Sequence, residues 1–443
     1  MVAANLEILS ELKFFLNDAA TDPELRRLFS ADKNQFTRKR KLPFEQLVAF
    51  IINLPKRSLS VELQDFFEVL GQSDTACTKS AFCQQRAKLN PLFFAVWNQW
   101  LVTSFYHHYG NKAKRWRGFR VQAVDGSSAY LLHTEGLVAH FGTQSNQHIA
   151  TPLARVLQVH DVLNDLTVWG NIGPIAKAEQ AMFADYIPHL SLDSLSIFDR
   201  AYPAYTLLYL MINEETPRHF VMRCKVGFNN EVRAFMRSQK CSKIVNISPS
   251  LNARRAMLQY GYIVTAKTSV KVRLVKVKLA NGTTEVLMTN LYDERLYPIT
   301  DLYYLYGLRW GVETAFGKQK NQLQMEQFSG HRVICIEQDY YSGLFVANLQ
   351  RIIENQSDDY LEQVNARRRL NYKINKNQCW AALKHNIVRL FLFGNEEQIL
   401  LQLQKAFERN LEPIRIGRKY PRIKKRKRQH GKFQTFTNYK RAF

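Results

Sequence analysis

The chain has 443 residues, longer than a typical single domain, so we expect two to four folded units, at least one with a substantial core. Hydrophobic residues make up 46% of the chain and aromatic residues 12%, which excludes an intrinsically disordered protein. Lys and Arg number 62 against 38 Asp and Glu, and the formal net charge of +24 indicates a polyanionic partner such as nucleic acid. The six cysteines show no CxxC spacing, which argues against a zinc site or disulfide framework and favours a reducing cytoplasm.

Residues 1–112 show helical periodicity and are predicted to form a separate helical domain. The N-terminus has neither a basic leader nor a long apolar run, so we expect no signal peptide and no membrane span. The stretch TKSAFCQQRAKL, residues 78–89, begins with a Thr cap and has a composition suited to a DNA groove, with Lys79, Gln84, Gln85, Arg86 and Lys88. An ordinary exposed helix face explains that composition equally well.

Residues 113–217 change to strand periodicity, with alternating runs over 120–128, 153–162 and 165–172. A helix, a short apolar strand ending in Asp199 and a second helix follow. This order predicts an α/β layer with a mixed sheet. His160 is interpreted as a core histidine, and Glu179, at the start of the first helix, as an acid favoured by the helix dipole.

The remaining chain divides into three further segments. Residues 218–294 read as a β-rich insertion, with a hairpin at Asn281-Gly282, and residues 295–355 return to helix. Residues 356–443 are predicted to be a helical C-terminal region with a basic tail, which has twelve Lys or Arg and no acid from Arg415 to Arg441. A solvated tail is the commoner explanation of such a run, and phosphate contact is the alternative.

The stretch YGLRWGVETAFGKQK, residues 306–320, places four polar side chains on one predicted helix line: Tyr306, Arg309, Glu313 and Lys320. Residues three, four or seven apart are neighbours on a helix surface. A solvent-facing ladder with a weak ion pair between Arg309 and Glu313 is the ordinary explanation of such spacing. Two acids elsewhere in the chain favour a functional explanation.

Asp125 and Asp199 each lie at the end of a predicted apolar strand. A buried, unpaired carboxylate is costly, but two such groups on neighbouring strands are well placed to bind a divalent metal. Together with a helical Glu313 they predict a site for two Mg²⁺ ions, with Mn²⁺ as a substitute, suited to phosphodiester cleavage. Arg309, Lys320, Tyr306 and Arg200, beside Asp199, are then candidate DNA-binding residues, because Arg and Lys can hold the flanking phosphates.

The pattern Tyr306-x2-Arg309-x3-Glu313-x6-Lys320 resembles the Y-R-E-K signature of the IS4 family of bacterial insertion-sequence transposases, including its spacing. The resemblance runs from about residue 125 to residue 320. It includes Asp125 followed by Gly-Ser, Asp199 followed by Arg, and the TNL at residues 289–291.

The resemblance implies an α/β fold with an RNase H-like catalytic core, divided into residues 113–217 and 295–355 by the β-rich insertion. The N-terminal helical domain would bind the element's ends, and the catalytic and metal-binding triad would be Asp125, Asp199 and Glu313. The implied activity is Mg-dependent DNA cleavage at inverted-repeat ends, through hairpin ends, and joining of the 3′ ends to target DNA. The implied setting is the bacterial cytoplasm, away from membranes, with double-stranded DNA and a second copy of the chain as partners.

Two positions depart from the family pattern. Ala201 stands where the family commonly has Gly in D-R-G-Y, and we expect only a local backbone difference. No Trp occurs between Trp169 and Trp310, so the residue that stacks on a flipped base in relatives would here be Phe or Tyr. The candidates, for each of which a core position is the ordinary explanation, are Phe228, Phe235, Tyr260 and Tyr262.

Two other functions are compatible with this sequence. One is a catalytically idle, transposase-derived DNA-binding protein, and the other is a nuclease without strand transfer. The three acids and the four signature residues are all intact, which favours the active enzyme, because a protein that only binds DNA needs no acids facing a phosphate.

Overall fold

The N-terminal part of the chain is helical, as the sequence predicted. The computed structural model describes residues 1–415 and 417, apart from 33, 39, 146–149, 214 and 280–281. Its first six helices are α1 (Val2–Thr21), α2 (Pro23–Leu28), α3 (Phe44–Ile52), α4 (Leu59–Val69), α5 (Lys79–Arg86) and α6 (Leu92–Tyr109). Within the described ranges, no helix is long and apolar enough to cross a bilayer.

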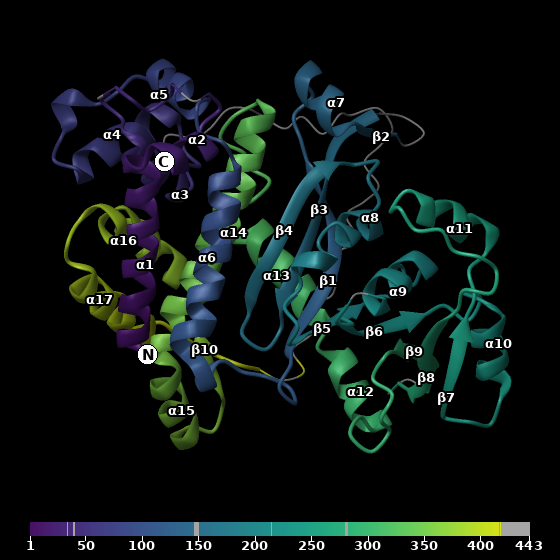
Figure 1. Cartoon of the computed structure of the whole chain (residues 1–443). Helices are drawn as coiled ribbons and strands as arrows, with labels where there is room; N and C mark the ends of the chain where they lie inside the picture. Colours follow the sequence, from purple (N-terminus) through teal and green to yellow (C-terminus); the bar gives the residue numbers. More distant parts are fainter. Residues whose placement is uncertain are drawn as a thin grey trace, which may run out of the picture.

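A mixed sheet lies at the centre of the molecule, and the described residues contribute nine strands to it (Figure 1). The spatial order is β2-β3-β1-β5-β6-β9-β8-β7, with β4 paired to β3. The strands are β1 (Arg120–Tyr130), β2 (Thr143–Ser145), β3 (Ala150–Asp161), β4 (Leu166–Pro174), β5 (Ser194–Phe198), β6 (His219–Cys224), β7 (Ser242–Ile247), β8 (Val270–Lys278) and β9 (Thr284–Thr289). Only the β1–β5 and β5–β6 pairs are parallel; the other pairs are antiparallel.

The segment expected as a β-rich insertion extends this same sheet. Strand β6 pairs with β5, and β9, β8 and β7 follow it in the sheet. Residues 218–294 therefore share a continuous hydrogen-bonded layer with β1 and β5. Antiparallel pairing of β8 with β9 confirms the hairpin, whose turn residues 280–281 lie outside the described residues. This segment also carries α10 (Asn230–Arg237) and α11 (Leu251–Leu258), which lie at the β7 end of the sheet (Figure 1).

Helices cover both faces of the sheet because its strands alternate buried side chains. Val121, Ala123 and Ile197 pack on one face with α12 (Ile299–Gly307) and α13 (Trp310–Asn321). Val124 and Phe198 point to the other face, in one cluster with α8 (Glu179–Ala184) and α9 (Tyr205–Ile212). A further short helix, α7 (Glu135–Phe141), caps the β2–β3 end.

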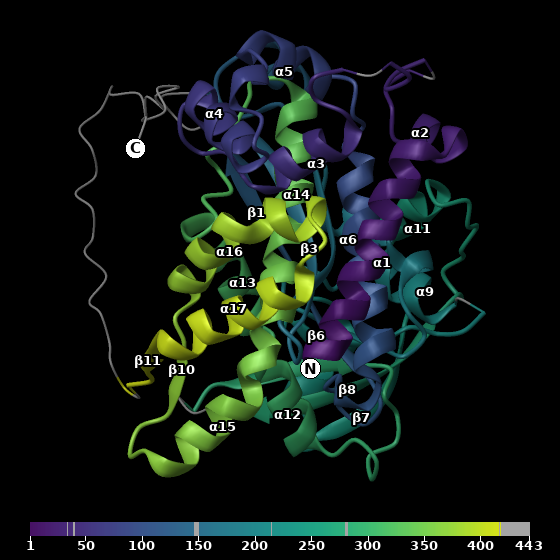
Figure 2. The same cartoon turned by 90° about the vertical axis from the view of Figure 1, so that its left-hand side faces the viewer.

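The long buried helix α14 (Val333–Glu354) joins the sheet to the N-terminal helices. It packs against α6, where the rings of Trp97 and Phe345 stack with centroids 4.0 Å apart. The C-terminal elements are α15 (Asp358–Arg367), β10 (Tyr372–Ile374), α16 (Lys376–Leu392), α17 (Glu396–Arg409) and β11 (Leu411–Pro413). Figure 2 shows α16 and α17 beside α1 and α14, so both chain ends contribute to one helical layer. Beyond residue 417, the predicted basic tail lies outside the described residues.

Helix α5 carries the residues proposed for a DNA groove, but Arg86 does not face solvent. Its guanidinium is buried against α14, where it pairs with Asp339 at 2.6 Å and donates to Gln338 at 2.6 Å. Gln85 is also buried and donates to the Leu42 carbonyl. The exposed polar positions of the helix include Lys79 and Gln84. The sequence could not separate these faces because α5 is short and mostly polar, and its partners on α14 lie about 250 residues later.

We predict that Arg86→Met destabilises the protein by about 3–5 kcal/mol, because it leaves the buried Asp339 carboxylate without its counter-ion. Chemical denaturation would measure the loss. Lys79→Met on the exposed face of the same helix is the matched control and should change stability by less than about 0.5 kcal/mol. Equal effects of the two substitutions would contradict a structural role for the ion pair.

Candidate active site

The first two candidate acids come together because β1 and β5 run in parallel. Val124 lies opposite Phe198 in this pair, and an aspartate follows each of them. Asp199 comes directly after the end of β5, as predicted, but Asp125 lies in the middle of β1 and not at its end, because β1 continues to Tyr130 through its pairing with β3. By the alternation of strand side chains, both carboxylates belong to the face covered by α12 and α13. Both are half-buried. The sheet therefore places two acids side by side, below the helices that carry the signature.

Burial raises the pKa of Asp125 to about 6. The neighbouring charges of Asp199 and Glu179 raise this pKa as well, whereas the Gly126 N–H, 3.0 Å from Oδ1, and the charge of Arg309 lower it. Asp199 is held by its own turn, where Oδ1 accepts a hydrogen bond from the Ala201 N–H at 2.7 Å. Because the charge of Asp199 disfavours the ionised form of Asp125, a cation bound between them would be favoured.

The third acid is engaged by the signature arginine. An oxygen of Glu313 lies 2.8 Å from Nη2 of Arg309, and the Arg309 guanidinium rests on the Trp310 ring at 4.3 Å from its centroid. The Arg309 side chain is buried, and its charge acts on Asp125. Arg309 thus stands between the helix-borne acid and the strand-borne acids and links them electrostatically.

The three carboxylates do not form a single ligand group in this structure. Across the described residues, no three His, Cys, Asp or Glu side chains lie close enough together to hold a metal ion. Asp125 and Asp199 are neighbours, and Glu313 reaches them only through Arg309. The donor chemistry suits a hard divalent cation, but binding by all three acids requires the Arg309–Glu313 pair to open.

The single helix line predicted for the signature is wrong. Helix α12 ends at Gly307 and α13 begins at Trp310, so Tyr306 lies on one helix and Glu313 and Lys320 on the next. At the junction the N–H of Arg309 bonds to the carbonyl three residues back, at 3.1 Å, which tightens the turn. Periodicity alone could not reveal the break, because a helix-to-helix junction of this kind preserves nearly helical backbone angles.

The candidate DNA-binding residues differ in their access to solvent. Arg200 is exposed, and Lys320 is half-buried and donates to the Ser128 carbonyl at 2.7 Å. Tyr306 and Arg309 are buried. Direct phosphate contact in this conformation is therefore open to Arg200 and partly to Lys320, while Arg309 serves to orient Glu313.

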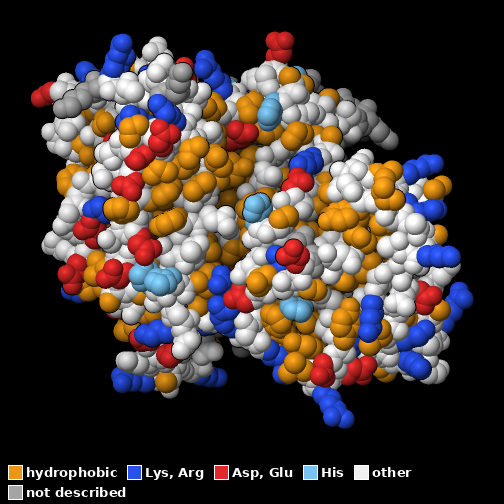
Figure 3. Space-filling view, in the orientation of Figure 1, with side chains coloured by type: hydrophobic (Ala, Val, Ile, Leu, Met, Phe, Trp, Pro, Cys, Tyr) orange, Lys and Arg blue, Asp and Glu red, His pale blue; other side chains and the backbone are white. Residues whose placement is uncertain are grey.

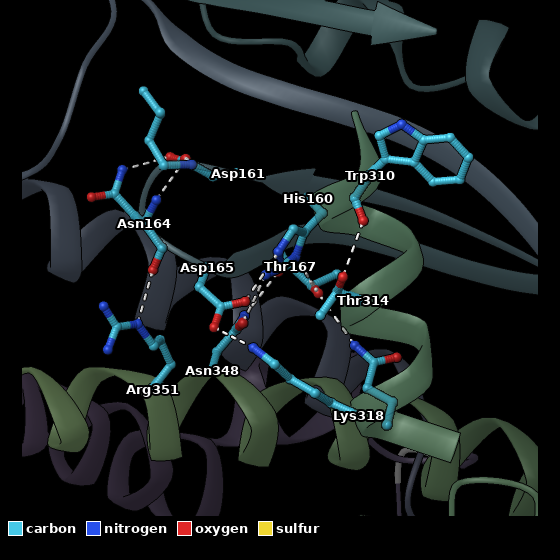
Figure 4. Close-up of polar contacts among 12 residues, drawn as sticks. His160, Asp161, Asn164, Asp165, Thr167, Trp310, Thr314, Lys318, Asn348 and Arg351 are labelled. Carbon is cyan, nitrogen blue, oxygen red and sulfur yellow. Dashed lines mark hydrogen bonds and ion pairs between the residues drawn. The ribbon is translucent and has the colours of Figure 1, made fainter. Parts of the chain in front are cut away.

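An ion network holds α13 against the β3–β4 turn (Figure 4). Asp165, at the turn with a φ of 59°, pairs with Lys318 of α13 and lies 3.3 Å from Nε2 of His160. His160 also contacts Thr167 at 3.2 Å, which confirms it as a satisfied core histidine. Opposite charges surround Asp165, so the network fixes the helix that carries Glu313 rather than taking part in the candidate site itself.

Glu179 is the acid near this site whose place the sequence did not reveal. The helix-dipole interpretation accounts for its position at the first turn of α8, but its carboxylate also lies against β1 at Gly126 and bonds to Arg155 and Tyr202. The only sequence signal was the glycine after Asp125, which permits such an approach.

The sheet edge formed by β7, with α10 and α11, is strongly basic (Figure 3). Lysine and arginine side chains gather there, and the exposed ones include Arg233, Arg237, Lys240, Lys243, Arg255 and Lys267. Of the four aromatic candidates for base stacking, Phe235 is buried and Tyr262 is 39% exposed. This edge offers a polyanion both positive charge and an accessible ring.

We predict that the stability of the protein in chelating buffer falls as the pH rises through the titration of Asp125. Between about pH 4 and pH 6 this carboxyl ionises in the unfolded chain, with its ordinary pKa of 3.8, but stays protonated in the folded chain. Relative to Asp125→Asn, the parent's free energy of unfolding should fall by about 2 kcal/mol from pH 4 to pH 7. Urea unfolding would measure this difference, and a flat or rising difference would contradict the burial of the carboxyl.

The chain is similar to two known proteins. No protein-family model matches the sequence. The transposase InsG for insertion sequence element IS4 of Escherichia coli (strain K12) is 23% identical over 338 residues, which cover 74% of each chain. A solved structure, the piggyBac transposase synaptic complex with hairpin DNA, aligns with 91% of this chain and 81% of its own at a TM-score of 0.40 and 11% identity. The sequence similarity to InsG and the intact Y-R-E-K signature together support an IS4-family transposase.

Proposed function

We propose that this transposase binds the inverted-repeat ends of an insertion sequence, cleaves them by metal-assisted phosphodiester chemistry and joins the 3′ ends to target DNA. Asp125, Asp199 and Glu313 are its proposed catalytic residues. The proposal rests above all on one observation: Asp125 and Asp199 directly follow the last residue pair that joins the parallel strands β1 and β5, on the face covered by the helix that carries the signature glutamate. Hairpin ends, as in the family the chain resembles, are part of the proposal.

The surroundings of the acids support metal-assisted chemistry. Hard oxygen donors are the ligands that Mg²⁺ and Mn²⁺ prefer, and a bound cation would stabilise the ionised form of Asp125, which burial and the neighbouring acids disfavour. When bound, two such ions activate the attacking oxygen and stabilise the charge on the leaving 3′ oxygen. The chain's own contribution is to hold two of the carboxylates on the rigid β1–β5 pair and to keep Glu313 within reach through Arg309.

The sheet from β1 to β6, with its helices on both faces, supports an RNase H-like core as the catalytic domain. In this arrangement residues 113–217 and 295–355 supply the acids, and residues 218–294 supply the basic edge. The N-terminal domain, residues 1–112, offers the exposed Lys79 and Gln84 of α5 to the DNA ends. Since two ends must be paired before joining, we propose that a homodimer acts on the DNA.

The four candidate DNA-binding residues have distinct proposed roles. Arg200, exposed beside Asp199, is placed to contact a phosphate that flanks the scissile bond. Lys320 anchors α13 to the Ser128 carbonyl and retains partial access to DNA. Tyr306 and Arg309 are buried, so their contact with DNA would follow a rearrangement of the α12–α13 junction.

We predict that Glu313→Gln abolishes Mg²⁺-dependent cleavage of DNA carrying the terminal inverted repeats while leaving end binding nearly intact. The substitution removes the carboxylate charge and preserves the shape of the side chain. Gel-shift and cleavage assays would measure the two properties, with Thr314→Ser, on the exposed neighbouring position, as a matched control. Parent activity should also disappear with a chelator and return with Mg²⁺ or Mn²⁺.

Product analysis separates the three candidate functions. End binding without nicking by the parent, unchanged by Asp199→Ala, would identify a DNA-binding protein without catalysis. Cleavage without strand transfer into a plasmid would identify a nuclease. If Glu313→Gln and Asp199→Ala both cut at the parent rate, the assignment of the acids is wrong.

We predict that Arg200→Ala weakens end binding and lowers the dependence of log affinity on log salt by about one unit, because one phosphate contact and its released counter-ion are lost. Binding titrations at several salt concentrations would measure the slope. Arg367→Ala, an exposed arginine at the end of α15, is the control and should leave the slope unchanged. An unchanged slope for Arg200→Ala would remove this residue from the interface.

A further inference from the structure

Glu179 lies behind the candidate active site, on the opposite face of β1 from Asp125. Gly126 follows Asp125 directly, so by strand alternation it points to the face of α8. A Cβ atom on Gly126 would lie 1.9 Å from the carboxyl carbon of Glu179. The carboxylate therefore rests on the strand only because residue 126 has no side chain.

Two side chains from other elements hold this carboxylate. Arg155 of β3 donates from Nη1 to Oε1 of Glu179 at 3.0 Å, and the hydroxyl of Tyr202 donates to Oε2 at 3.1 Å. Arg155 pairs in register with Ser128 of β1, and Tyr202 is only 1% exposed. One carboxylate thus connects β1, β3 and the turn that follows β5.

That turn is the one that orients the second aspartate. Tyr202 lies three residues after Asp199, and its N–H bonds to the Asp199 carbonyl at 3.3 Å. Gln180, next to Glu179 on α8, donates to the carbonyl of Ala201, whose N–H in turn binds the Asp199 carboxylate. Glu179 and Gln180, the first two residues of α8, therefore both bind the turn after β5, from the face of the sheet opposite the aspartates.

We propose that Glu179 is a positioning residue that sets the separation of Asp125 and Asp199 from behind the strands without touching the DNA. The inference rests on the proposed function of those two aspartates and adds the residue that fixes their spacing. A helix-dipole role alone leaves the contacts with Arg155 and Tyr202 and the approach to Gly126 without explanation. We call Glu179, with Arg155 and Tyr202, the brace. It acts through the position of the backbone, because these residues contact the strand and the turn rather than the outer face of the two aspartates.

The first test separates cleavage from binding. Glu179→Ala should slow single-turnover cleavage of terminal-repeat DNA about tenfold to a hundredfold, as the loss of supporting contacts around catalytic ligands typically does, with end-binding affinity within about twofold of the parent. Glu179→Gln keeps the size of the side chain and one acceptor oxygen, so its cleavage rate should lie between those of the parent and Glu179→Ala. Lys177→Ala, which breaks an exposed pair with Asp185 near the same helix, is the matched control and should cleave at the parent rate. Cleavage by Glu179→Ala at the control rate would overturn the inference.

The second test is a double-mutant cycle on the approach of Glu179 to β1. Gly126→Ala forces the Glu179 carboxylate away and should lower the melting temperature, whereas in the Glu179→Ala background the new methyl group has room and should cost little. Gly173→Ala in β4, where a Cβ meets nothing within 4 Å, is the control and should melt close to the parent. Additive losses from Gly126→Ala and Glu179→Ala would overturn the proposed contact.

The cycle is measured on protein without DNA or metal, so its outcome does not depend on cleavage. A parent that fails to cleave in Mg²⁺ would contradict the proposed function, while non-additive melting would still support the brace. If the parent cleaves DNA but Gly126→Ala and Glu179→Ala lower the melting temperature additively, only the brace is overturned, and the proposed function stands.

Discussion

Parallel pairing of β1 with β5 is the constraint on which the rest of the site depends. The register puts Asp125 and Asp199 side by side, directly after the last pair of residues that joins the two strands, with their carboxylates on the same face. A sheet edge is rigid, so the separation of these acids is set by backbone hydrogen bonds rather than by flexible side chains. Burial is the main cause of the raised pKa of Asp125, and the neighbouring charge of Asp199 raises this pKa further. Arg309 approaches from the helix side and Glu179 supports the strand from behind.

The helix side of the site is positioned by packing at a distance from the acids. Gly311 lies against Val162, where a Cβ would come within 2.9 Å of the valine side chain, so α13 can sit close to the β3–β4 turn. Asp165 then holds the last turn of α13 through Lys318. Because these contacts bind the helix to the same hairpin that flanks β1, the signature glutamate and the strand acids belong to one packed unit. This connection explains how residues separated by almost 200 positions can act together.

Sequence patterns captured the features that depend on local periodicity. Alternation predicted β1, β3 and β4, the short apolar run ending in Asp199 predicted β5, and Asn281-Gly282 predicted the β8–β9 hairpin. Features that depend on distant partners escaped prediction. The sequence indicated an exposed cation at Arg86, but in the fold this side chain pairs with Asp339 of α14. It indicated a helix-start acid at Glu179, but in the fold Arg155 and Tyr202 bind this carboxylate. The break between α12 and α13 also escaped, because the junction residues keep helical backbone angles.

The central claim is that Asp125, Asp199 and Glu313 jointly bind divalent ions when the protein engages its DNA. Titration of Mn²⁺ by electron paramagnetic resonance, on the complex with terminal-repeat DNA, tests this claim most directly. We expect the parent complex to bind Mn²⁺ at sites that are lost or weakened in Asp125→Asn, Asp199→Asn and Glu313→Gln alike. Undiminished Mn²⁺ binding in all three variants would contradict the claim.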